Sequence, residues 1–206
     1  MNYKDKEFLN AASHAIGIVL GIVGLFFLLV FNTGRGEYST LSIWFYAISI
    51  IILYSASTVY HAVTHVEWKA ILRKIDHISI YILIAGTYTP VALITLEKGA
   101  GWLIFWTVWG IAALGTVLKI FFTGKFELFS LLLYLAMGWL IVFDFQELVA
   151  KTTDTGLNLL MAGGAFYTVG IIFYAIERIP YNHLIWHFFV LGGSICHYLF
   201  IFYDVI

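Results

Sequence analysis

Two histidines near the end of the chain have the spacing of a metal-binding pair. His183 and His187 stand four residues apart where the last apolar segment begins. On a helix, residues separated by four positions lie on one face, so both imidazoles would point the same way. Ionisable side chains at the edge of a membrane span are rare and usually have a partner or a functional role. A metal site needs at least one further ligand, which another segment must bring.

The composition indicates an integral membrane protein. Of the 206 residues, 62% are hydrophobic and 11% are charged, whereas a soluble domain carries about 25% charged residues. The net charge of −1 gives no indication of nucleic-acid binding, and we expect none. The single cysteine, Cys196, excludes an internal disulfide and argues against a cysteine-based metal site. The first apolar run lacks a small-residue cleavage site and is followed by many further spans, so we interpret it as a membrane helix.

Seven apolar segments are long enough to cross a bilayer, which takes about 20 residues each. They are residues 11–31, 41–62, 77–96, 100–121, 127–146, 157–176 and 184–203. The fifth has the shortest uninterrupted apolar stretch, from Leu128 to Phe143. Continuous apolar runs contradict the alternation that a β-barrel requires. We therefore expect an all-α bundle of seven transmembrane helices, forming one domain over residues 1–206.

The lysines and arginines of the loops indicate the orientation. If the N-terminus is cytoplasmic, eight lie on the cytoplasmic side and three lie outside. The inner set is Lys4, Lys6, Lys69, Arg73, Lys74, Lys119, Lys125 and Arg178, and the outer set is Arg35, Lys98 and Lys151. Basic residues concentrate in cytoplasmic loops. The sequence therefore predicts a multi-pass protein of the inner (plasma) membrane with its C-terminus outside.

The longest inner loop, residues 63–76, has apolar residues at helical spacing. They are Trp68, Ile71, Leu72 and Ile75, and charged residues stand between them. Two interpretations remain open for this segment. It could form a short helix lying at the inner membrane interface, or it could continue the second span.

The predicted topology places most histidines in one layer. Six of the seven fall at the cytoplasmic ends of the predicted spans: His14, His61, His65, His77, His183 and His187. The seventh, His197, lies about 15 Å deeper in the last span by helical rise. Taken singly, His14, His65 and His197 fit capping, packing or interfacial roles. The remaining members of the layer are candidates for chemistry.

Three imidazoles and one water form the usual open zinc site. His61 on the second span, together with His183 and His187 on the seventh, could supply the three imidazoles. Ser57 precedes His61 by four residues and shares its helix face, so it could orient a ligand or a water on the metal. Asp76 enters the same layer and could support a ligand or act as a general base.

Three motifs follow one another along the chain. They are Ser57-x-x-x-His61, then Asp76-His77 leading into residues 83–90, then His183-x-x-x-His187 with the later His197. In this order they resemble the haemolysin III family. That family is the bacterial branch of the progestin and adipoQ receptor group, which includes the adiponectin receptors and is distantly related to alkaline ceramidases. The opening Glu7-x-x-Asn10-x-x-Ser13-His14-x-x-Gly17 extends the resemblance over nearly the whole chain.

The resemblance implies a seven-helix bundle with zinc near the cytoplasmic face. Its three histidine ligands match His61, His183 and His187. Its serine and aspartate match Ser57 and Asp76, with a water between the metal and the aspartate. Ceramidase-like hydrolysis of lipid amides has been proposed for eukaryotic relatives. Bacterial members are associated with membrane homeostasis, and some with haemolysis.

Our leading hypothesis is a zinc-dependent hydrolase of an amide or ester bond in a membrane lipid, such as a ceramide-like or acyl lipid. Asp76 would be the general base, and Ser57 would hold the oxyanion or the water. One alternative is a membrane sensor or receptor-like protein with structural zinc. Others are a pore-forming haemolysin, although few buried charges are available to line a path, and a bis-histidine haem protein. The last span has no lysine for a retinal Schiff base.

Overall fold

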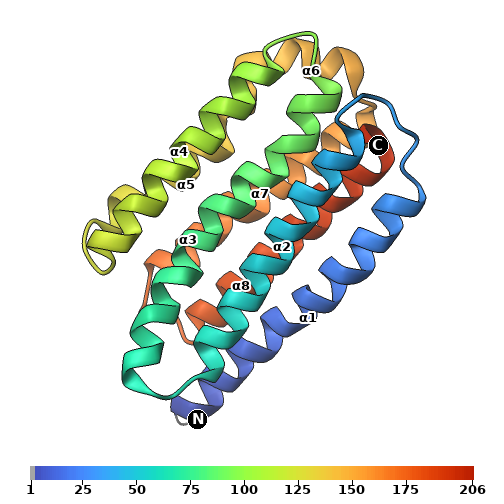
Figure 1. Cartoon of the computed structure of the whole chain (residues 1–206). Coiled ribbons are helices and arrows are strands. Elements are labelled where there is room, and N and C mark those ends of the chain that lie inside the picture. The colour runs from blue at the N-terminus through green and yellow to red at the C-terminus, as the bar shows by residue number, and fades with distance from the viewer. Residues whose placement is uncertain (1–2) are drawn as a thin grey trace.

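The computed structural model describes residues 3–206, and the described chain forms helices joined by short turns, with no strand (Figure 1). The α-helices are α1 (Tyr3–Val30), α2 (Ser39–Ala62), α3 (Val66–Pro90), α4 (Gly101–Phe122), α5 (Glu127–Gly138), α6 (Phe145–Lys151), α7 (Asp154–Ala175) and α8 (Asn182–Phe200). A 3-10 helix spans Leu140–Asp144, and π-helices span Val91–Thr95 and Ile201–Val205.

Within residues 3–206, seven helical segments are long and apolar enough to cross a membrane, which confirms the predicted fold class. They are Lys4–Val30, Ser39–Ala62, Val66–Thr95, Gly101–Phe122, Glu127–Lys151, Asp154–Ala175 and Asn182–Val205. Successive spans run in opposite directions, so the two chain termini lie at opposite ends of the bundle (Figure 1). We call these the N-terminal end and the C-terminal end.

The third span begins earlier than the sequence indicated. We predicted a start at residue 77, but α3 starts at Val66, and only three residues separate it from α2. Both interpretations of residues 63–76 were therefore wrong, because residues 63–65 form a turn and residues 66–76 form the first turns of α3. Charged side chains such as Arg73 lower the hydropathy of these turns without breaking the helix. His77 consequently lies three turns inside α3.

The fifth span is interrupted, at the place where its apolar stretch was shortest. The chain passes from α5 through the 3-10 helix to α6, and the three pieces together cross the bundle. Only 11% of this span is buried, compared with 56% of α2 and 61% of the third span. The fifth span is therefore attached to the bundle by few side chains.

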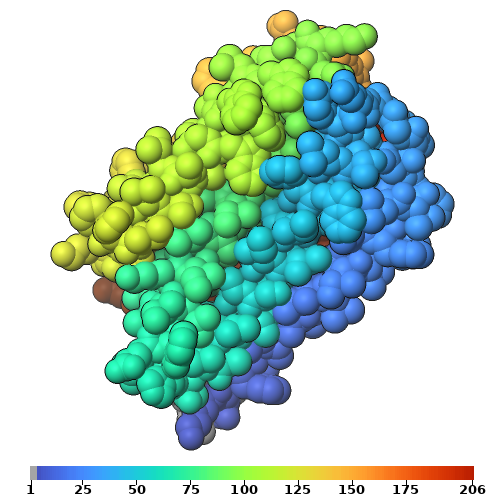
Figure 2. All heavy atoms as spheres, viewed as in Figure 1, coloured from blue at the N-terminus to red at the C-terminus, as the bar shows by residue number. Residues whose placement is uncertain are grey.

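The first helix approaches α2 closely because of a glycine. A Cβ atom built on Gly17 would lie 2.4 Å from the ring of Tyr54 on α2, so a side chain there would push the helices apart. In the bundle α1 lies at one edge beside α2 and α8, and α4 lies near the opposite edge (Figure 1). Figure 2 shows one face, on which side chains of α1 to α4 cover nearly all of α8.

Candidate metal centre and cavity

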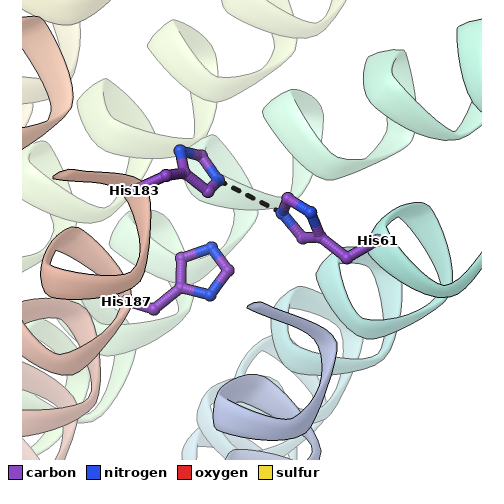
Figure 3. A group of neighbouring side chains, drawn as sticks. All are labelled: His61, His183 and His187. Carbon is purple, nitrogen blue, oxygen red and sulfur yellow. Dashed lines mark hydrogen bonds between the residues drawn. The ribbon is translucent and has the colours of Figure 1, made fainter. Parts of the chain in front are cut away.

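Three histidines from two helices meet at the N-terminal end of the bundle. His61 lies in the last turn of α2, and His183 and His187 lie in the first turns of α8. Their rings face a common point (Figure 3), and one ring nitrogen of each lies within 4.8 Å of the others. The Nε2 atoms of His61 and His183 are 3.1 Å apart. Zinc–imidazole bonds of about 2.0–2.1 Å in a tetrahedron separate nitrogens by about 3.3 Å, so this group could hold a metal ion.

The other ring nitrogens of two of these histidines already have partners. The Nδ1 atom of His61 is 3.3 Å from the Glu7 carboxylate. The Nδ1 atom of His187 is 2.9 Å from the Ser13 hydroxyl and 3.2 Å from the Asn10 carbonyl oxygen. Metal-binding histidines usually engage their second nitrogen in this way. The residues present therefore fit a metal bound through Nε2.

A cavity of about 530 Å³ adjoins the histidine group and is lined by residues of α1, α2, α3, α5, α7 and α8. His183 and His187 form part of its wall, as do Ser57 and Asp76. The buried Ser57 hydroxyl is a hydrogen-bond partner of the Asp76 carboxylate. The structure thus brings all five predicted site residues to one place. Ligand cavities typically measure about 300–1,000 Å³, so this space can hold a sizeable molecule.

The cavity is long and mostly apolar. It reaches from the histidine group to His197, which is about 15 Å away from His187 along α8 by helical rise. A second cavity of about 60 Å³ continues beyond it and shares Thr87, Tyr88 and His197 with the first. A mostly apolar space of this length suits a hydrocarbon chain.

The other histidines have separate surroundings. His14 is buried, lines the cavity and stacks on His187 with 3.6 Å between ring centroids. His77 also lines the cavity, and its Nδ1 is 3.9 Å from the Glu127 carboxylate. His197 makes a 3.2 Å contact with the Leu160 carbonyl oxygen. The exposed His65 occupies the position just before α3, and its side chain makes no capping hydrogen bond there.

Two polar groups were not anticipated from the sequence. At the N-terminal end, the buried Lys119 of α4 donates to Glu127 of α5 at 2.6 Å, and Arg73 lies 3.7 Å from the same carboxylate. Deeper in the bundle, Tyr54 of α2 donates to Ser194 of α8 at 2.8 Å, and Tyr167 of α7 is 2.8 Å from the same hydroxyl. Each group joins three helices.

The sequence was also compared with models of known families. The model described as "Haemolysin-III related" matches residues 2–198. The chain belongs to the haemolysin-III related family. This confirms the resemblance inferred from the motifs, and it agrees with the seven apolar helices in indicating a multi-pass membrane protein.

Three curated relatives match this chain over most of its length and over most of their own length. "Hemolysin-3 homolog" of Bacillus subtilis is 44% identical over 92% of this chain and 89% of its own. "Hemolysin-3" of Bacillus cereus is 42% identical over 93% and 88%. "Monocyte to macrophage differentiation factor" of Homo sapiens is 31% identical over 92% and 80%. No solved structure matches this chain.

Proposed function

We propose that this haemolysin-III family protein is a zinc-dependent hydrolase that cleaves an amide or ester bond of a membrane lipid. The supporting observation is the position of three convergent imidazoles at the wall of a long apolar cavity. Structural zinc sites are usually closed by four protein ligands, whereas catalytic sites have three and leave one position open. The metal-binding group found among residues 3–206 has three members. This favours catalysis over a sensor with structural zinc.

Zinc suits this donor set because three imidazoles and one open position are typical of its catalytic sites. When bound, it would supply Lewis acidity that polarises a carbonyl group and makes water more acidic. The protein would supply everything else. The cavity would hold the acyl chain, exclude bulk water and direct the scissile carbonyl toward the histidine end.

Asp76 is our candidate for the proton-transfer residue. Its carboxylate would take a proton from a water molecule while the water oxygen bonds to the acyl carbon. The bond from that carbon to the amide nitrogen or ester oxygen would then break. Asp76 would return the proton to the leaving nitrogen or oxygen, so that the products are a fatty acid and an amine or alcohol. Ser57 would hold the carboxylate in position through its hydrogen bond.

The test combines metal analysis with lipid hydrolysis on one preparation of the wild-type protein. We expect about one zinc per chain and release of fatty acid from at least one member of a panel of ceramides and lysolipids. Chelation should abolish the release, and added zinc should restore it. Protein that holds zinc yet releases no fatty acid from the panel would refute the hydrolase proposal for those substrates.

We also propose that the N-terminal end of the bundle faces the cytoplasm. The support is the excess of lysine and arginine at this end, where eight of the 11 lie. The metal centre would then lie at the cytoplasmic side of the inner (plasma) membrane. Reporter fusions at Ile206 should be active outside the cytoplasm, and activity restricted to the cytoplasm would contradict this orientation.

A further inference from the structure

We infer that the first turns of α1 position two of the metal ligands. Glu7 would fix the imidazole of His61, and Ser13 together with the Asn10 carbonyl would fix that of His187. Each ring would then present Nε2 to the metal. The inference rests on the proposed metal centre and adds positioning residues from a helix that contributes no member of the three-histidine group.

Glu7 determines which nitrogen of His61 is free. Its ionised carboxylate can only accept hydrogen bonds, so the Nδ1 atom 3.3 Å away must carry the proton, and Nε2 keeps its lone pair. Lys69 of α3 holds Glu7 through an ion pair. The Lys69 ammonium is fixed in turn by the carbonyl oxygens of Tyr60 and Val63, at 3.2 and 3.3 Å. His61 and Lys69 therefore both contact the same oxygen, Oε2, of the Glu7 carboxylate.

The same reasoning applies to His187. The Ser13 hydroxyl donates its proton to the Asn10 carbonyl oxygen at 2.8 Å, so toward the imidazole the Ser13 oxygen acts as an acceptor. With the hydroxyl oriented in this way, its contact with Nδ1 at 2.9 Å fits a proton on Nδ1. The Asn10 carbonyl, 3.2 Å from the same nitrogen, also accepts only. All three groups are buried, where an unmade hydrogen bond is costly.

The spacing of these groups explains how one helix reaches two ligands. Glu7, Asn10 and Ser13 are three residues apart and fall along one side of α1. One turn after Ser13, the absent side chain of Gly17 lets α1 approach α2 closely. Without these bonds either imidazole could rotate or adopt the other tautomer. Loss of such supporting partners typically weakens metal binding by about 10–100-fold.

The experiment measures zinc affinity by competition with a chelator in detergent solution. Glu7→Ala should weaken binding by about 10–100-fold. Glu7→Gln should weaken it less, because the amide oxygen still accepts a hydrogen bond. Ser13→Ala should have a smaller effect again, because the Asn10 carbonyl remains. The control is Glu67→Gln on α3, an exposed carboxylate of the same end, which should bind zinc like the wild type.

Nitrogen-15 NMR of labelled histidine gives a second measurement that does not depend on activity. Zinc-loaded wild type should show His61 and His187 protonated at Nδ1, and Glu7→Ala should lose this single state at His61. If Glu7→Ala does not fold, the zinc affinities of Glu7→Gln and Ser13→Ala still test the inference. Wild-type affinity and tautomers in all of these variants would overturn the inference and leave the metal centre standing. Absence of zinc from the wild type would overturn both.

Discussion

The cavity has two walls that are held in different ways. On one side, α2 is 56% buried and packs directly on α1, and it carries Ser57 and His61. The fifth span, whose α5 also lines the cavity, is 11% buried. The residues proposed for metal binding and proton transfer lie on α2, α3 and α8, and none lies on α5. The spans that carry these residues are 56%, 61% and 33% buried, so each is packed more fully than the fifth span, which lines the cavity.

The α5 wall is attached by separate polar contacts. The Tyr134 hydroxyl donates to the carbonyl oxygen of His77 at 2.9 Å. The Tyr88 hydroxyl donates to the Gly138 carbonyl oxygen at 2.8 Å and accepts from the backbone N–H of Ile141 at 3.0 Å. Each hydrogen bond contributes only about 1 kcal/mol. Removal of one of these bonds should therefore weaken the attachment of the α5 wall by about that amount.

The largest expected effect is loss of the metal when a histidine of α2 is replaced. His61→Ala should reduce zinc from about one per chain to near zero, because two imidazoles do not complete the site. His197→Ala is the matched control and should retain zinc, since it lies about 15 Å from His187. Elemental analysis of purified variants checks both. If His197 proves necessary and His61 does not, the ligand assignment is wrong.

The next effect should appear in the rate without loss of the metal. Asp76→Asn keeps the shape of the side chain and its capacity for hydrogen bonding, so zinc should remain bound. Removal of a general base costs about 10²–10⁴-fold in rate. Zinc content and fatty-acid release are measured on the same preparation. A variant with zinc and undiminished hydrolysis would exclude Asp76 as the base.

A smaller effect is expected where α5 is held by charge. Glu127→Gln leaves the buried Lys119 without its ionic partner, and because Glu127 is partly exposed we expect a loss of about 1–3 kcal/mol. Thermal unfolding in detergent measures this loss, and zinc content should not change. Glu147→Gln is the control, because its exposed pair with Lys151 contributes about 0.3–0.5 kcal/mol. Equal destabilisation by both changes would contradict a special role for the α5 attachment.

The smallest effect should follow Tyr134→Phe, which removes one hydrogen bond between α5 and α3 and costs about 1 kcal/mol. Hydrogen exchange in nanodiscs should show faster exchange in α5, with α2 unchanged. Faster exchange in both helices would mean that the two walls are not independent.

Most of the fold could be predicted because hydropathy reports directly on membrane spans. Two details differed: the fifth span is interrupted by a 3-10 helix, and α3 starts early, where charged residues lower hydropathy although they permit a helix. Hydropathy shows where a segment enters the apolar layer, and a helix can extend beyond that layer. For this reason the hydropathy pattern did not predict the turn at residues 63–65.

The candidate site was predictable only in part. The four-residue spacing of His183 and His187, together with alternating spans, was enough to predict that His61 joins them. The contacts of Glu7 and Ser13 were not foreseen, because polar residues near the start of a span resemble ordinary interfacial ones. Their three-residue spacing was the available signal. The cavity itself depends on side-chain packing, which a single sequence does not reveal.

The hydrogen bond between Tyr54 and Ser194 has a consequence for the rotation of α8 about its own axis. Tyr54 precedes His61 by seven residues, and Ser194 follows His187 by seven, so on antiparallel helices the two pairs stack about 10 Å apart. Seven residues fall only about 20° short of two full turns. A rotation or a one-residue slip that turned His187 away from His61 would also break this buried bond. The bond between Tyr54 and Ser194, two helical turns away from the imidazoles, therefore helps to fix the rotation of α8 that directs His187 toward His61.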